Sequence, residues 1–158
     1  MSGPFFSIKD AVTLSVASVG AVLGILNTWK AIDRDRPKLR VVPKHAIPLG
    51  GADPRLRMSI EVVNLSTFPL TVDEVGLLYR GTNKRAPVLQ PVLNDGGAWP
   101  RRLEPRSAVT AYLDPDWIQY RQNIRCAYAM TECGLKFEGS SPALKQIAAQ
   151  PRPSGMQE

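Results

Sequence analysis

Few side chains in this 158-residue chain have the types and spacing that metal binding requires. The chain has one histidine, His45, and two cysteines, Cys126 and Cys133, which lack the C-x-x-C spacing of a metal site. His45 falls in a Pro-rich connector far along the chain from both cysteines, so we interpret it as an exposed loop histidine. We therefore predict no metal and no cofactor, and we expect both thiols to be free.

Catalytic patterns are equally sparse. Asp114 and Asp116 have the spacing of an acid–base pair, but capping of a short helix is a simpler explanation for both carboxylates. The sequence contains neither G-x-S-x-G nor H-E-x-x-H, and its Gly-Gly pairs do not form a phosphate loop between a strand and a helix. We predict that the protein is not an enzyme.

Two basic segments suggest recognition rather than catalysis. Residues 80–87 and 94–102 are the predicted contact loops, and their candidate contact residues are Lys84, Arg85, Trp99, Arg101 and Arg102. Arginines beside a tryptophan suit phosphate contact and base stacking. Glu104 interrupts the basic patch, however, and we favour a Trp that covers the end of a β-domain. Nucleic-acid binding is kept as the least favoured alternative, behind an unidentified protein partner.

Composition limits the class of protein that can carry these residues. Hydrophobic residues make up 44% and charged residues 22% of the chain, which is typical of a folded domain and argues against wholesale disorder. Fourteen prolines favour short strands and turns over long helices. The net charge of +6 permits attraction to anionic lipid, nucleic acid or acidic proteins without choosing among them.

Near the N-terminus lies an apolar stretch, residues 11–29, which contains no charged residue. As a helix it would span about 28 Å, close to the ~30 Å hydrocarbon core of a bilayer. Trp29 and Lys30 at its end suit a membrane interface. We predict a transmembrane helix; a helix that packs within a soluble domain or assembly is the alternative.

Small side chains share one face of this predicted helix. At about 100° per residue they line up as a stripe of the kind that close helix packing in lipid uses. The stripe predicts a possible homo-oligomer. Its members are Thr13, Ala17, Gly20, Ala21 and Gly24.

Flanking charge predicts the orientation of the span. Lys9 is the one basic residue before it, whereas a basic cluster follows it. Because Lys and Arg stay on the cytoplasmic side, we expect the N-terminus outside and the large domain in the cytoplasm, at a bacterial inner membrane. There the connector would meet an anionic lipid surface, and the sequon at Asn64 would not be glycosylated. The predicted membrane-interface residues are Trp29, Lys30, Arg34, Arg36, Lys38 and Arg40.

Strand-like alternation replaces the helical period from Lys38 onward. Short alternating runs separated by turn signals predict about seven strands, as in a two-sheet sandwich. A parity change at Asp73–Glu74 predicts a bulge, and Cys126 is expected on the core face of its strand. The predicted strands lie in the stretches 39–42, 56–64, 70–80, 87–92, 107–114, 124–131 and 135–138.

Two short helices and the domain limits complete the expected architecture. One predicted helix covers 115–123, and another starts at Ser141 and runs to about Gln150. The expected parts are a transmembrane helix with a short outer tail (1–32), a basic Pro-rich connector with the first strand (33–54), a sandwich body (55–140), and a short helix with a loose tail (141–158).

A resemblance agrees with this architecture. The segments NTWK, EVVNLSTFPLTVDEVGL, LEPRSAV and CAYAMTECGLKFEG resemble those of small bacterial and phage-borne proteins. The resemblance implies one membrane helix followed by an immunoglobulin-like β-sandwich, and it supplies no catalytic residue. Similar proteins often have glycine where this chain has Arg106. The expected function is therefore a membrane-anchored module for protein interaction or scaffolding; the alternative is a soluble phage-encoded accessory protein whose N-terminal helix mediates oligomerisation.

Overall fold

The computed structural model describes residues 8–47, 49–50, 53–115, 118 and 123–150. The chain divides into two compact units, residues 1–36 and residues 37–158. The first contains a helix and the second contains the strands, so each unit is described by itself.

Helix α1 (Ile8–Arg34) is 27 residues long. Its interior holds no proline, and Asp10 lies in the first turn, where a carboxylate interacts favourably with the helix dipole. The helix ends three residues before Pro37, in keeping with the restriction that proline places on the residue before it. The predicted N-terminal helix is confirmed, and it extends slightly beyond its predicted end.

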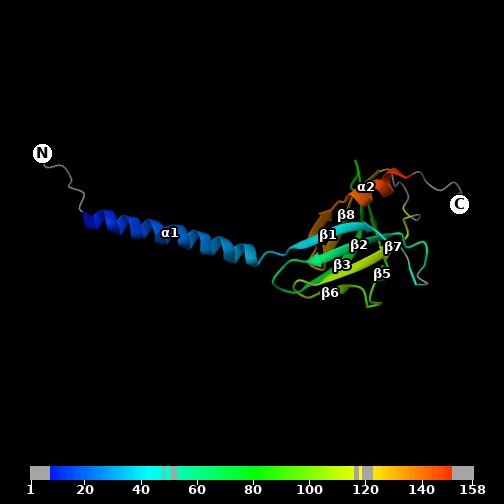
Figure 1. Ribbon diagram of the computed structural model, residues 1–158, viewed down its shortest axis with the longest axis horizontal. Coiled ribbons are helices and arrows are strands. Elements are labelled where there is room, and N and C mark those ends of the chain that lie inside the picture. Colours follow the sequence, from blue (N-terminus) through cyan, green and yellow to red (C-terminus); the bar gives the residue numbers. More distant parts are fainter. Residues whose placement is uncertain (1–7, 48, 51–52, 116–117, 119–122, 151–158) are drawn as a thin grey trace. The chain divides into compact units, whose positions relative to one another are not determined.

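The second unit is a mainly β sandwich of two antiparallel sheets, as the sequence predicted (Figure 1). The described residues form nine strands. One sheet contains β1 (Leu39–His45), β2 (Met58–Asn64), β7 (Ala108–Leu113) and β5 (Val92–Leu93), in that spatial order. The other has the order β4 (Arg85–Pro87), β3 (Leu70–Tyr79), β8 (Ile124–Thr131) and β9 (Lys136–Gly139), and β6 (Arg101–Leu103) also pairs with β3.

The strand count differs from the predicted seven in two places. The predicted strand at 87–92 is two short strands, β4 and β5, which belong to different sheets. Pro87 and Pro91 lack the N–H that a continuous ladder needs, and the chain crosses between the sheets there. Strand β6 was missed because its residues were assigned to a contact loop.

Alternation along β2 places Met58, Ile60 and Val62 in the core, where each is fully buried. The predicted bulge in β3 is confirmed, because its register with β8 shifts between Val72 and Glu74. This shift lets both Val72 and Val75 face the core.

The predicted face of β8 is wrong beyond its first residue. Ile124 lies in the main core, but a second register shift next to it changes the parity of the strand. As a result Ala127 and Ala129 face the core, and Cys126 packs instead with Leu78 and Tyr128 in a separate cluster on the outer face of the sheet.

Helix α2 (Pro142–Ala149) confirms the second predicted helix. Ser141 caps it, since its Oγ accepts a hydrogen bond from the Leu144 N–H and donates one to the Pro43 carbonyl. Leu144 and Ile147 bury against the core of the sandwich. Most of the other predicted helix, 115–123, and the predicted loose tail from residue 151 lie outside the described residues.

Arg106 adopts a left-handed backbone conformation, with φ of 64°. Its N–H donates to the Asn64 carbonyl at 3.0 Å, so the turn is fixed to the end of β2. Non-glycine residues pay about 1–2 kcal/mol for this conformation.

Replacement of Arg106 by glycine is therefore expected to raise the free energy of unfolding slightly. Relief of strain offsets the greater freedom of glycine in the unfolded chain, which leaves a gain of about 0.5 kcal/mol. Arg106→Ala, which keeps the strain, is the matched control. Urea unfolding followed by tryptophan fluorescence measures both, and a glycine variant less stable than the alanine variant would contradict the expectation.

Candidate functional site

The most unusual surface in the protein is that of α1. Every described side chain from Lys9 to Arg34 is exposed within its unit. Among the described residues, α1 is the one helix long and apolar enough to cross a membrane, and its most apolar 18-residue window has a mean hydropathy of 1.7. Large apolar side chains such as Leu14, Val19 and Ile25 are more than half exposed.

The small-residue stripe is open on α1, and two of its members, Ala21 and Gly24, reach a shallow groove that Ile25 and Ile32 also line. A side chain added at Gly20 or Gly24 would meet no atom within 4 Å. Near Gly24 this groove is lined by Ala21, Thr28 and Trp29. The predicted packing residues thus share one accessible face.

The hydroxyl groups along α1 are satisfied inside the helix. Thr13 Oγ1 donates to the Lys9 carbonyl at 2.9 Å, and Ser18 Oγ donates to the Leu14 carbonyl at 2.7 Å. Ser15 and Thr28 make the same bond to the residue four positions earlier. Such bonding lowers the cost of placing a hydroxyl in an apolar medium, which a membrane span requires.

The predicted membrane-interface residues divide between the two units. Trp29, Lys30 and Arg34 belong to α1, and Arg36 follows it directly. Lys38 and Arg40 begin the β-domain, where the Lys38 N–H donates to Ser66 Oγ at 2.7 Å and Arg40 is exposed on β1.

His45 occupies the last position of β1 rather than a loop, which corrects the sequence interpretation. It is exposed, as predicted, and its Nε2 lies 3.1 Å from Gln146 Oε1 on α2.

The two predicted contact loops meet the same edge of β3. Strand β6 pairs with the first part of β3, at Leu70–Val72, and β4 pairs with its second part, at Gly76–Leu78. The structure therefore brings Lys84 and Arg85 to the sheet edge that also carries Arg101 and Arg102.

Trp99 is not free to stack on a ligand. Its Nε1 donates to the Asp73 carbonyl at 2.9 Å, and its half-buried ring packs against the main core. The prediction that this tryptophan covers part of the sandwich is confirmed.

Most of the nearby arginine charge is compensated. Arg101 pairs with Asp95, Arg102 Nε lies 3.1 Å from Glu104 Oε1, and Arg85 Nε lies 3.4 Å from Glu74 Oε1. This arrangement gives little net attraction for a polyanion such as nucleic acid.

A cavity of about 1180 Å³ opens beside this edge. Leu77, Leu113 and Ile118 line it with side chains that are almost fully buried, and Val88 adds a half-buried surface. These residues come from segments far apart in the sequence, so no local pattern could have identified the cavity. Lys84 and Arg85, which also line it, were selected for their charge alone.

The outer face of the second sheet carries a polar cluster with no nucleophilic character. Tyr128 donates a hydrogen bond to Glu74, and burial together with this carboxylate raises the pKa of Tyr128 well above its usual value. Burial likewise raises the pKa of the Cys126 thiol, whose Sγ lies 3.4 Å from Glu138 Oε2. Both groups remain protonated at neutral pH, which is unsuited to nucleophilic attack.

The cysteines are unpaired, as predicted; Cys126 is buried and Cys133 is exposed. We expect a maleimide to modify Cys133 of the native protein at pH 7.5 and to leave Cys126 unmodified, because only an accessible thiolate reacts. Mass spectrometry would show one adduct on the native protein and two in urea. The Cys133→Ser variant is the control, and rapid modification of its native form would contradict this expectation.

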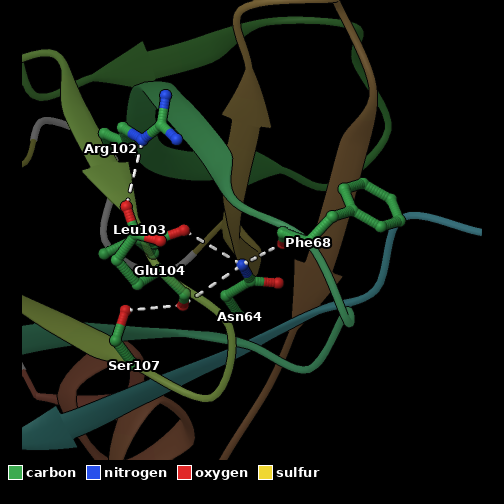
Figure 2. Close-up of polar contacts among 6 residues, drawn as sticks. All are labelled: Asn64, Phe68, Arg102, Leu103, Glu104 and Ser107. Atoms are coloured by element: carbon green, nitrogen blue, oxygen red, sulfur yellow. Dashed lines mark hydrogen bonds and ion pairs between the residues drawn. The ribbon is translucent and has the colours of Figure 1, made fainter.

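The sequon asparagine is unavailable for modification because its side chain is built into the fold (Figure 2). Asn64 is fully buried, and its Nδ2 donates to the carbonyls of Phe68 at 2.9 Å, Leu103 at 3.1 Å and Glu104 at 3.3 Å. Its Oδ1 accepts the Ser66 N–H at 2.9 Å. In the folded domain this asparagine is thus closed to a glycosyltransferase.

Within the part of the chain that the structure describes, no three His, Cys, Asp or Glu side chains gather as metal ligands would. In comparisons with known proteins, no family model matches the chain, and no curated protein matches it either. The site is therefore judged on its own geometry.

Proposed function

We propose that the protein is a single-pass membrane protein whose β-sandwich binds another protein or acts as a scaffold on the cytoplasmic face of a bacterial inner membrane. The observation that carries this proposal is α1: a 27-residue helix with exposed apolar side chains. Water would penalise this surface, whereas a bilayer accommodates it.

The orientation rests on the basic residues around the span. Lys9 precedes the apolar segment, whereas Lys30, Arg34, Arg36 and Arg40 follow it. The excess after the span favours a cytoplasmic β-domain, and the same cations favour an anionic leaflet near the connector.

The strand order supports an immunoglobulin-like assignment. Reading β1, β2, β7 and β5 as strands A, B, E and D gives one immunoglobulin sheet. The order β4-β3-β8-β9 then corresponds to C′, C, F and G. Sandwiches of this type carry recognition in loops and edges, and the β4/β6 edge is the candidate contact surface here. The paired arginines there favour a protein partner over nucleic acid, and no enzymatic function is proposed.

The experiment is carbonate extraction of the full chain beside a variant that lacks residues 1–36. We expect only the full chain to remain in the membrane pellet. Recovery of both proteins in the supernatant would overturn the membrane proposal.

Orientation is tested separately with Cys133, whose thiol is exposed on the β-domain. A membrane-impermeant maleimide should modify it in inverted vesicles and not in intact spheroplasts. Equal modification in spheroplasts would reverse the proposed topology.

A second candidate function is favoured by the open small-residue stripe on α1. In this case the protein is a soluble accessory protein whose α1 helices assemble with one another. It requires detergent-free full-length protein that sediments as an oligomer and becomes monomeric when Gly20 and Gly24 are both replaced by leucine.

A further inference from the structure

The cavity beside β4 has two features that belong together in a ligand site: an apolar floor and a cationic mouth. The floor consists of core side chains, among them Leu77, Val88 and Leu113. Its volume of about 1180 Å³ is slightly above the range typical of small-molecule sites, about 300–1,000 Å³, which leaves room for a long ligand.

Two cations at the mouth have no carboxylate partner among the described residues. Arg80 and Lys84 both line the cavity, and the Tyr79 N–H donates to the Lys84 carbonyl at 3.4 Å across the turn that joins β3 to β4. The turn is closed by Gly81, whose φ of 68° suits glycine. This geometry holds the two cationic residues at either end of one tight turn.

The other two cations of the lining, Arg55 and Arg85, are paired with carboxylates. Arg55 pairs with Asp53 at 2.9 Å, and hydrogen bonds from Arg55 lower the pKa of that carboxyl group. Arg85 pairs with Glu74, which lies outside the cavity lining. A second carboxylate, Asp114, also lines the cavity. The described lining still has four cations against two carboxylates, so its net charge is positive, and Arg80 and Lys84 are the cations available to a ligand.

We propose that this cavity binds a single-chain amphipathic anion, such as a long-chain fatty acid carboxylate. The acyl chain occupies the apolar floor, and the carboxylate meets Arg80 and Lys84 at the mouth. Burial of each methylene contributes about 0.8 kcal/mol, while the two cations fix the orientation of the chain. The proposal concerns the β-domain alone and does not depend on the membrane anchor.

The test uses the full chain in nanodiscs of zwitterionic lipid and a palmitate analogue that carries a photoreactive diazirine. Cross-linked peptides are located by mass spectrometry, and labelling of α1 serves as the internal reference for probe in the bilayer. We expect labelling of the β4–β5 segment. Palmitate should compete with the probe, hexadecanol should compete about tenfold less well because it lacks the charge, and acetate should not compete.

The variant Arg80→Ala/Lys84→Ala should reduce cavity labelling about tenfold while labelling of α1 stays constant. Lys136→Ala/Lys145→Ala removes the same charge from exposed positions outside the lining and should have no effect. Labelling confined to α1, equal competition by hexadecanol, or equal loss in both double variants would overturn the proposal. Displacement of the probe by anionic phospholipid added to the nanodiscs would also overturn it, since the occupant would then be a bilayer lipid.

Discussion

Replacement of Asn64 by alanine is expected to lower the free energy of unfolding by about 3 kcal/mol, because it leaves several buried polar groups without partners. The Asn64 amide donates to the carbonyls of Phe68 and Leu103, and its oxygen accepts the Ser66 N–H. Glu104 is less affected, since its carbonyl also accepts bonds from the N–H and Oγ of Ser107. The amide thus adds side-chain bonds from the end of β2 to the turn that follows it and to the end of β6.

Urea unfolding of the full-length protein measures this loss, with Asn94→Ala as the control. Asn94 is exposed, so its replacement should change the free energy of unfolding by less than about 0.5 kcal/mol. If Asn64→Ala were as mild as the control, water would have replaced the amide, and the proposed role of the network would be wrong.

The Asn64→Asp variant separates hydrogen bonding from shape. A carboxylate keeps the acceptor for Ser66 but turns a negative charge toward carbonyl oxygens, so at pH 7 the variant should be at least as unstable as Asn64→Ala. Those surroundings raise the pKa of the folded carboxyl above its unfolded value of about 3.9. The folded state then binds more protons between these two pKa values, so stability falls as pH rises through that window. We expect a smaller deficit at pH 4 than at pH 7.

The sequence predicted a helix or strand correctly where the hydrophobic pattern lay within that one segment. The uncharged segment 11–29 predicted α1, and alternation predicted β2 with the correct core face. The bulge at Asp73–Glu74 was visible because apolar residues lie on both sides of a parity change.

Non-local effects explain the failures. The bulge next to Ile124 has no glycine or proline to mark it. The alternation therefore looks unbroken in the sequence, and it wrongly predicted Cys126 on the core face of β8. The crossing between sheets at 88–91 resembles a strand because it begins with a short apolar run, and only the pairing of β4 and β5 with different partners reveals it. The cavity could not be predicted for the same reason, since β3, β4 and β7 meet there only in the folded domain.

Asn64 shows how one short pattern supports two explanations. Asn-x-Ser is a glycosylation sequon, but the same spacing lets the asparagine oxygen accept the serine N–H two residues later. Its position at the end of an alternating run was the available signal for the second explanation. Two carbonyl partners of the amide, Leu103 and Glu104, lie at the end of β6 and just after it, about 40 residues along the chain, where the sequence does not place them.

The largest effect is expected in α1, where arginine at both Val19 and Val22 should abolish membrane insertion. These residues lie near the middle of the uncharged segment, and both side chains are more than half exposed. An arginine at the centre of a span costs about 3 kcal/mol on insertion scales, so two cost about 6 kcal/mol. The ratio of inserted to uninserted protein should therefore fall by about four orders of magnitude.

Arginine at Ala31 and Ile32 supplies the matched control, because the same two charges then join the basic cluster that follows the span. This variant should stay in the carbonate-resistant pellet, and its orientation should be unchanged or more uniform, since the added charge lies on the side that already carries the excess. If α1 instead packs in a soluble assembly, carbonate treatment would release the wild-type protein from the membrane fraction. The Val19→Arg/Val22→Arg variant would then dissociate the assembly without any lipid present. Retention of Val19→Arg/Val22→Arg in the pellet would show that α1 does not hold the protein in the membrane.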